Sequence, residues 1–296
     1  MINIGIVGLD TSHSESFAEV LAERAAVDIA GVWDSGDIRT SSYVDSFCER
    51  YEAHHYDDPH EMCDNIDAVM ILTVNWDTHR ELAVPFLERG VPTMVDKPIA
   101  GNLEDIKAIE DAAGGTPFFG GSAVPYHSAV QSLESNGDDQ SLYCIGYDDP
   151  FYYGAHLVDT VHNVVDESWV TVSASDNPGS TVDIVFKNGT YANLRLDGPG
   201  VKEQFVFLSV GNRSTVVEVG SDPADMEDMY STYVDTFLDI AIERRVSDIR
   251  GLDAAKLLVG VHAALDSNRP ITPESQLLSE WAIEGKSFLD EYEPYY

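Results

Sequence analysis

Lys97 stands where a cation could bind a ligand. It follows a short apolar run from Thr93 to Val95 and lies between Asp96 and Pro98. The run predicts a strand, and Pro98, which has no backbone N–H, predicts that the strand ends there. Open α/β sheets bind ligands at the carboxyl ends of their strands. The sequence therefore indicates a cation in a ligand crevice, with an exposed lysine that merely follows a strand as the alternative.

His156 is a second candidate, because a histidine titrates near neutral pH. Asp149-Pro150 is typical of a helix start, with the aspartate as cap and the proline in the first position. A helix from Pro150 places Tyr152, His156 and Asp159 on one face. His162 lies about 120° away on the same helix, at about 3.6 residues per turn. Two partners for His156 stay open, the Tyr152 hydroxyl and the Asp159 carboxylate.

A strand, a turn and a helix open the chain, and this order is typical of a dinucleotide-binding fold. Of the Gly-x-Gly-x-x-Gly fingerprint, the turn keeps the first glycine, Gly8. Asp10 and His13 occupy the second and third positions. Asp10 would place a carboxylate near a pyrophosphate, and His13 could contact cofactor or substrate.

The hydroxyls of Thr11 and Ser12 could bind phosphate oxygens at the amino end of the first helix. They could equally act only as caps and turn formers. Ser12 and Glu15 match a capping box, which predicts that the helix begins at about residue 13.

Asp34 ends the second predicted strand, where a carboxylate can accept a hydrogen bond from an adenosine ribose hydroxyl. This position favours NAD over NADP, because Arg39 is the sole basic residue nearby that could receive a 2′-phosphate. A solvated aspartate at a strand end is the alternative.

Strands alternate with helices through the first 120 residues, which predicts a doubly wound parallel sheet, that is, an N-terminal Rossmann domain over residues 1–120. The predicted strands span 2–7, 27–33, 53–56, 68–73, 91–95 and 117–119. The predicted helices span 13–24, 41–51, 59–65, 78–89 and 103–113.

After about Gly120 the pattern changes to a C-terminal α+β domain over residues 121–296, with a mainly antiparallel open sheet. Asn188-Gly189 predicts a tight hairpin. The predicted strands span 142–147, 169–174, 181–186, 190–196, 204–210 and 214–219. The predicted helices span 126–135, from 150 onward, 230–244, 252–267 and 281–289, with a turn at 136–139.

The composition is strongly acidic. The 296 residues include 52 acidic and 17 basic side chains, for a formal net charge of -35. This surface repels nucleic acid and anionic membranes, so we expect neither as a partner. The acids are dispersed through amphipathic patterning, which favours a globular protein adapted to high salt.

Several classes of segment and site are not expected from this sequence. No apolar run approaches the about 20 residues that span a bilayer, and the N-terminus lacks the basic region of a signal peptide. Three scattered cysteines fit a reduced, cytoplasmic location. His54 and His55 would point to opposite faces of a short strand, and with His60 and Cys63 they complete no zinc tetrahedron, so we expect no metal.

Asp96-Lys97-Pro98 resembles the Glu-Lys-Pro that ends the fifth strand in the glucose–fructose oxidoreductase / inositol dehydrogenase (Gfo/Idh/MocA) family. Residues 73–79, Thr-Val-Asn-Trp-Asp-Thr-His, are similar to the family's Thr-Pro-Asn-x-x-x-His. Residues 154–159, Gly-Ala-His-Leu-Val-Asp, are similar to its Gly-x-His-x-x-Asp segment. Residues 251–272 resemble its C-terminal helix and tail, so the resemblance covers nearly the whole chain.

The resemblance implies hydride exchange between a nicotinamide cofactor and a carbon that bears a sugar or polyol hydroxyl. It implies that Lys97 bonds the reacting oxygen and helps hold the nicotinamide, and that His156 takes the hydroxyl proton. The family usually has an aspartate four residues before this histidine, where the present chain has Tyr152. The residues expected to contact the cofactor are Gly8, Asp10, Thr11, Ser12, His13, Asp34, Thr73, Asn75, His79, Asp96 and Lys97.

The leading hypothesis is an NAD-dependent oxidoreductase that acts on a hydroxyl group of a sugar-like or polyol substrate. The first rival is a non-catalytic NAD- or ligand-binding protein on the same fold. The second is an enzyme that uses NAD transiently for elimination or glycoside cleavage. A homodimer or homotetramer is expected, because the uncovered face of the second sheet would leave a large apolar patch.

Overall fold

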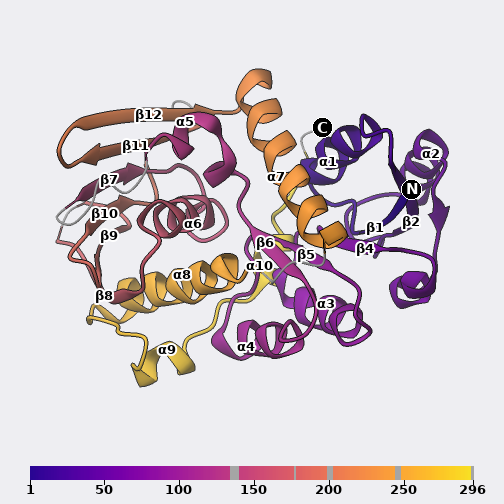
Figure 1. The fold of residues 1–296 in the computed structure, drawn as a ribbon. Helices are drawn as coiled ribbons and strands as arrows, with labels where there is room; N and C mark the ends of the chain where they lie inside the picture. The colour runs from indigo at the N-terminus through magenta and orange to yellow at the C-terminus, as the bar shows by residue number, and fades with distance from the viewer. Residues whose placement is uncertain (134–139, 177, 199–202, 244–247, 295–296) are drawn as a thin grey trace.

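The computed structural model describes residues 1–133, 140–176, 178–198, 203–243 and 248–294, which form two lobes side by side (Figure 1). The first lobe contains a six-stranded sheet in the order β3-β2-β1-β4-β5-β6, in which all neighbouring strands are parallel. This order is typical of a dinucleotide-binding sheet and confirms the predicted doubly wound architecture. The strands are β1 (Ile2–Val7), β2 (Val27–Trp33), β3 (His54–His55), β4 (Ala68–Ile71), β5 (Thr93–Asp96) and β6 (Phe118–Gly121).

The helices of the first lobe follow the predicted alternation. They are α1 (Ser12–Ala22), α2 (Ser41–Tyr51), α3 (His79–Glu88) and α4 (Leu103–Ala112), with short 3₁₀ turns η1 (Pro59–Asp64) and η2 (Trp76–Thr78). The predicted capping box is wrong. Thr11 caps α1 by accepting a hydrogen bond from the His13 N–H at 3.3 Å, while Glu15 accepts bonds from the Tyr43 hydroxyl and Arg50.

The second lobe contains a mixed sheet in the order β12-β11-β7-β10-β9-β8. Among the described strands, β7 and β10 form a parallel pair and the other neighbours are antiparallel, which confirms a mainly antiparallel sheet. Gly189, at a φ of 87°, turns the predicted hairpin between β9 and β10. The strands are β7 (Ser141–Ile145), β8 (Trp169–Ala174), β9 (Thr181–Phe186), β10 (Tyr191–Arg195), β11 (Gln204–Val210) and β12 (Ser214–Gly220).

The helices of the second lobe depart from prediction mostly at their ends. They are η3 (Val124–Tyr126), α5 (Ser128–Gln131), α6 (Gly154–Val165), α7 (Pro223–Glu243), α8 (Arg250–Ser267), α9 (Gln276–Glu280) and α10 (Gly285–Leu289). The helix predicted over 126–135 is two short turns. The helix predicted over 281–289 is helical from Gly285 to Leu289 only. The ends of two predicted helices, at 134–135 and 244, and the turn at 136–139 lie outside the described residues.

The start of α6 differs from the prediction because the Asp149 side chain caps a turn that precedes the helix. Its carboxylate accepts hydrogen bonds from the N–H groups of Phe151 and Tyr152, at 2.9 and 2.6 Å. The regular helix then begins at Gly154 rather than at Pro150. Tyr152 consequently lies in the turn before the helix, not on the helix itself.

The C-terminal segment returns to the first lobe (Figure 1). The Trp76 indole N–H donates to the Ile283 carbonyl at 3.0 Å, and the Asp77 carboxylate accepts from the N–H groups of Gly285 and Lys286. The segment that the sequence assigned to the second domain therefore packs against the carboxyl end of β4.

One apolar core joins the two lobes where α7 meets β6. The ring of Phe119 lies 4.8 Å from Tyr233 and 6.2 Å from Phe237, measured between centroids. Phe17 of α1 lies 5.7 Å from the same Tyr233 ring. Among the described helices, none is both long and apolar enough to cross a membrane.

Candidate active site

A cavity of about 540 Å³ opens between the two lobes, at the carboxyl ends of the first sheet. Lys97 and His156 both line it, although they come from different lobes. Thr11, Ser12 and His13 line the same cavity from the N-terminal turn. The fold thus brings the two candidate proton-exchanging residues together with the turn expected to hold a cofactor.

Lys97 is buried, with 4 % of its surface exposed, so the alternative of an exposed strand-end lysine is wrong. Its Nζ lies 3.2 Å from the ring centroid of Tyr152 and 5.3 Å from that of Tyr153. Burial lowers the pKa of Lys97 to about 7, against the opposing charges of Asp96 and Asp149. An aromatic face stabilises a cation without supplying a full negative charge.

His156 forms a buried hydrogen bond with a residue that the sequence did not indicate. Its Nδ1 lies 2.7 Å from the Ser122 Oγ. Burial lowers the pKa of His156 well below its usual value, and the nearby charges of Lys97 and His13 act in the same direction. The imidazole therefore stays neutral at neutral pH. Ser122 follows β6, and nothing in its local sequence marks it as a functional residue.

The Asp159 carboxylate has a hydrogen-bond partner in the turn that carries Ser122, and not in the His156 ring. Its Oδ2 accepts a short hydrogen bond from the Ser122 N–H, and its Oδ1 accepts one from Asn163 at 3.2 Å. Burial raises the pKa of Asp159 to about 7. Asp159 and Asn163 share a helix face as the spacing predicts, but the partner of the histidine is a serine.

The N-terminal turn has no room for a side chain at Gly8. Gly8 has a φ of +92°, and a Cβ there would lie 2.6 Å from the Thr73 Cγ2. The Asp10 side chain points inward, where its Oδ2 accepts from the Val74 N–H at 2.9 Å. Burial raises the pKa of Asp10 to about 7, and the charges of Asp34 and Asp37 add to this effect.

His13 and Asp96 form a buried pair, with 2.7 Å between Nδ1 and Oδ2. Although burial acts in the opposite direction, the His13 charge and hydrogen bond, together with Lys97, hold the pKa of Asp96 below its usual value. The His13 ring also stacks on Phe17 at 5.0 Å. This pair joins the start of α1 to the end of β5, next to Lys97.

Asp34 is half-buried at the carboxyl end of β2, beside the same turn. Its two oxygens accept from the Leu9 N–H and the Gly36 N–H, each at 2.8 Å. The carboxylate is thus held in one orientation and keeps further lone pairs for a ligand.

Thr73, Asn75 and His79 shape the loop after β4. The Thr73 and Thr78 hydroxyls are 2.9 Å apart, and the Asn75 Oδ1 accepts from the Asp77 N–H. The ring nitrogens of His79 lie 2.9 and 3.0 Å from the carbonyls of Thr73 and Ile99. His79 is fully buried and ties this loop to the segment after Pro98.

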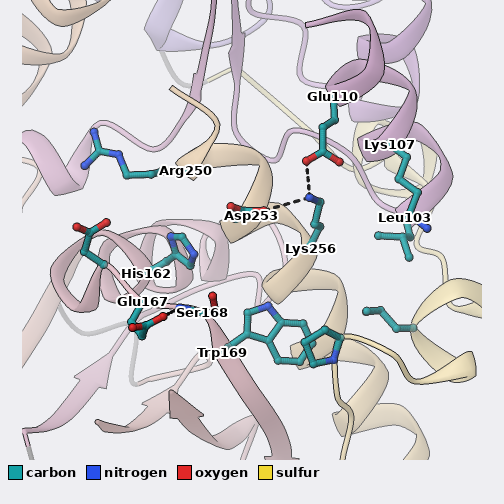
Figure 2. A pocket seen from close by; sticks show the side chains of 13 residues that line it. Leu103, Lys107, Glu110, His162, Glu167, Ser168, Trp169, Arg250, Asp253 and Lys256 are labelled. Carbon is teal, nitrogen blue, oxygen red and sulfur yellow. Dashed lines mark hydrogen bonds and ion pairs between the residues drawn. The ribbon is translucent and has the colours of Figure 1, made fainter. Parts of the chain in front are cut away.

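Figure 2 shows a second cavity, of about 520 Å³, between α4, α8 and the start of β8. Lys256 donates there to Glu110 at 2.7 Å and to Asp253 at 3.1 Å, and the first of these bonds joins the two lobes. His162 lines this cavity, in keeping with its angular separation from His156 on α6. Within the described ranges no group of three His, Cys, Asp or Glu residues could hold a metal ion.

Comparison with known proteins identifies a matching family model for the first lobe and a shared fold for nearly the whole chain. Residues 2–116 match the model of the Gfo/Idh/MocA oxidoreductase family, described as an NAD-binding Rossmann fold. A myo-inositol dehydrogenase from Lactobacillus casei, solved in complex with NAD(H) and myo-inositol, superposes with a TM-score of 0.76 at 13% identity and covers 92% of this chain and 96% of its own.

Two other solved structures are similar over nearly their whole length. A scyllo-inositol dehydrogenase from Lactobacillus casei gives a TM-score of 0.75 at 14% identity, over 93% of this chain and 99% of its own. A probable dehydrogenase from Thermotoga maritima gives a TM-score of 0.74 at 16% identity, over 92% of this chain and 99% of its own. Over residues 2–116 this chain therefore matches the Gfo/Idh/MocA oxidoreductase family model, and its overall fold is that of the solved inositol dehydrogenases.

Proposed function

We propose that this chain is an NAD-dependent oxidoreductase that moves hydride between a nicotinamide and a hydroxyl-bearing carbon of a polyol or sugar-like substrate. The observation that carries the proposal is the shared cavity. Lys97 and His156 come from different lobes yet line one space, next to a turn built like a dinucleotide site. The complex of the Lactobacillus casei enzyme with NAD(H) and myo-inositol supports the same class of substrate.

The residues of the N-terminal turn fit a dinucleotide. The backbone at Gly8 leaves no room for a Cβ, and α1 begins directly after the turn, so the positive end of the helix dipole can stabilise a pyrophosphate there. Near neutral pH a large share of Asp10 is protonated, which reduces repulsion of the phosphates. These features support binding without the second and third glycines of the fingerprint.

Two residues favour NAD over NADP. Asp34 presents a carboxylate where the adenosine ribose would lie, and a carboxylate repels a 2′-phosphate. Arg39 is buried; its Nε donates to the Leu9 carbonyl at 2.9 Å, and its guanidinium lies 4.3 Å from the Tyr43 ring centroid. These contacts within the protein hold the arginine in place, so it is not positioned to receive a 2′-phosphate.

The chain's own residues supply the proton chemistry of this reaction. A bound nicotinamide would accept the hydride that leaves the carbinol carbon. The Lys97 amine and the His156 imidazole both line the cavity, and each can exchange a proton or a hydrogen bond with the substrate oxygen. Burial keeps His156 neutral, while Lys97 changes charge near pH 7.

We further propose that the outer face of the second sheet pairs with another copy of the chain, giving a homodimer or homotetramer. Val216, Leu208 and Tyr143 lie in one row on adjacent strands. Val216 and Tyr143 are 60% and 44% exposed, while α6 and α8 contact the sheet from its other side. Exposed apolar rows of this kind mark protein interfaces. Free cysteines at 48, 63 and 144 fit the proposed cytoplasmic location.

The decisive experiment incubates the protein in molar salt with NAD and a panel of polyols and sugars, and follows the absorbance of reduced nicotinamide. Turnover that falls by orders of magnitude in Lys97→Ala and His156→Ala, but not in Lys107→Ala from the second cavity, would support the proposal. NAD binding without turnover across the panel would favour a binding protein. Cleavage of a glycoside without net NADH would favour transient use of the cofactor.

A further inference from the structure

Ser122 makes the hydrogen bond to the candidate active-site histidine and has no role in the function proposed so far. We propose that Ser122 is a positioning residue that holds His156 as the tautomer with its proton on Nε2. His156 then presents an N–H donor, and not a lone pair, to the substrate oxygen. The kinetic consequences of this inference rest on the proposed function, but the tautomer itself does not.

The turn that carries Ser122 is held from two helices. Asp159 of α6 accepts from the Ser122 N–H, and the Tyr233 hydroxyl of α7 donates to the Gly121 carbonyl at 2.8 Å. Gly121 has a φ of +99°, and a Cβ there would collide with the Asp159 carboxylate. These contacts leave the serine side chain little freedom to move away from His156.

The hydrogen bonds of the Ser122 hydroxyl decide the direction of the serine–histidine bond. The Oγ accepts from the Val124 N–H at 3.0 Å and lies 2.7 Å from the His156 Nδ1. If Nδ1 carried a proton, the Oγ would accept twice, and its own hydrogen would have no acceptor among the described residues. Ser122 is 1% exposed, so that hydrogen could not turn to bulk water. A buried donor without an acceptor is costly, so the hydroxyl donates to Nδ1.

The other ring nitrogen is then the one that faces the ligand. A neutral imidazole carries one proton, so an Nδ1 that accepts requires an N–H at Nε2. Burial, the largest cause, lowers the pKa of His156 well below its usual value, so the ring is neutral. His156 lines the cavity, and its Nε2 has no hydrogen-bond partner within the part of the chain that the structure describes.

This tautomer exchanges the roles that the family resemblance implies for the two residues. In alcohol oxidation the carbinol C–H bond would break, and a bound nicotinamide would supply the acceptor for its electron pair as hydride. The O–H proton passes to the neutral Lys97 amine, which becomes an ammonium, and the new carbonyl oxygen accepts from the His156 Nε2–H. In the reverse direction the ammonium returns the proton. Lys97 is then the base and His156 the hydrogen-bond donor.

Nitrogen-15 NMR of histidine-labelled protein tests the tautomer without any substrate. His156 is assigned as the resonance lost in His156→Gln. We expect the pattern of a ring protonated at Nε2 in the wild-type protein and in Ser122→Thr, which keeps the hydroxyl. We expect it to change in Ser122→Ala, while Ser132→Ala, which removes an exposed hydroxyl, leaves it unchanged. A wild-type ring protonated at Nδ1 would overturn the inference.

Kinetics provide the second readout. Ser122→Ala is expected to lower kcat by about tenfold or more with a smaller change in KM, since the hydrogen bond to the transition state is weakened. Ser122→Thr should restore most of kcat, and circular dichroism would verify that each variant is folded. A Ser122→Ala enzyme with wild-type kcat would overturn the positioning role. If no substrate is found, the NMR result still decides the tautomer of His156. A failure of the proposed function can therefore be distinguished from a failure of the proposed role of Ser122.

Discussion

The ammonium of Lys97 lies 3.2 Å from the ring centroid of Tyr152, at the junction of the two lobes. Tyr152 takes the place where the family resemblance leads one to expect an aspartate, and its ring stacks in turn on Phe288 at 4.3 Å. The cation is therefore covered by an aromatic face from the second lobe and not by a carboxylate. This arrangement has direct consequences for the pH dependence of the reaction.

The rate of alcohol oxidation should depend on the charge of Lys97. Because burial lowers the pKa of Lys97 to about 7, kcat/KM should rise with pH through about 7 as the amine loses its proton. Asp96 and Asp149 oppose this shift, and His13 and His156 also face the site. In Tyr152→Asp a nearby carboxylate would stabilise the ammonium and move the midpoint to higher pH, whereas Tyr152→Phe keeps the ring and the midpoint. Identical profiles for all three enzymes would contradict this assignment.

Removal of the Asp10 charge should strengthen cofactor binding in a pH-dependent way. An amide in Asp10→Asn can still accept from the Val74 N–H. With a pKa of about 7, the native carboxyl is mostly charged at pH 8 and mostly neutral at pH 6. We expect about fivefold tighter NAD binding at pH 8, or about 1 kcal/mol, and little change at pH 6.

Isothermal titration at both pH values measures the Asp10 effect. The exposed Asp45, on α2, provides the matched variant Asp45→Asn, which should change the affinity little at either pH. An equal gain for Asp10→Asn at pH 6 and pH 8 would show that charge is not the cause.

Substitutions at two glycines with positive φ distinguish the free-energy cost of backbone strain alone from the cost of strain combined with a steric collision. Gly36→Ala, at a φ of +79° with no atom within 4 Å, should lower the free energy of unfolding by about 1 kcal/mol. Gly121→Ala adds a collision with Asp159 and should cost about 3 kcal/mol. It should also lower kcat, because Ser122 is displaced from His156. Chemical denaturation gives both energies, and equal losses in the two variants would argue against a tightly held turn.

A charge on the outer face of the second sheet should break the proposed oligomer. Val216→Asp places a carboxylate beside Leu208, in the row that leads to Tyr143. Sedimentation velocity in high salt should then show a monomer. Ile242 on α7 is 54% exposed, so Ile242→Asp is a control that should leave the assembly intact. A wild-type protein that sediments as a monomer would refute the proposed pairing.

Salt should stabilise the folded state. With a net charge of -35, the acidic side chains repel one another, and the Debye length falls to about 3 Å at about 1 M salt. The melting temperature, followed by circular dichroism, should rise steeply from low to molar potassium chloride. A melting temperature that does not change with salt would disprove adaptation to high salt.

The sequence by itself determined the fold class and the position of Lys97, because both depend on local signals. Continuous apolar runs predicted the buried parallel strands, and Pro98 fixed the end of β5. The Asn188-Gly189 turn between two predicted strands predicted the hairpin of β9 and β10. The predicted start of α6 was wrong, because the Asp149 side chain bonds the N–H groups of the turn before the helix.

The tertiary structure alone decided the contacts of the site, since they join residues far apart in the chain. Ser122 meets His156 across 34 positions, and His13 meets Asp96 across 83. Tyr152 reaches Lys97 because the turn before α6 docks on the end of β5, next to the returning C-terminal segment. No periodicity encodes such pairings: each depends on how two elements pack, and packing sets the burial that shifts the pKa of Lys97 and of Asp10.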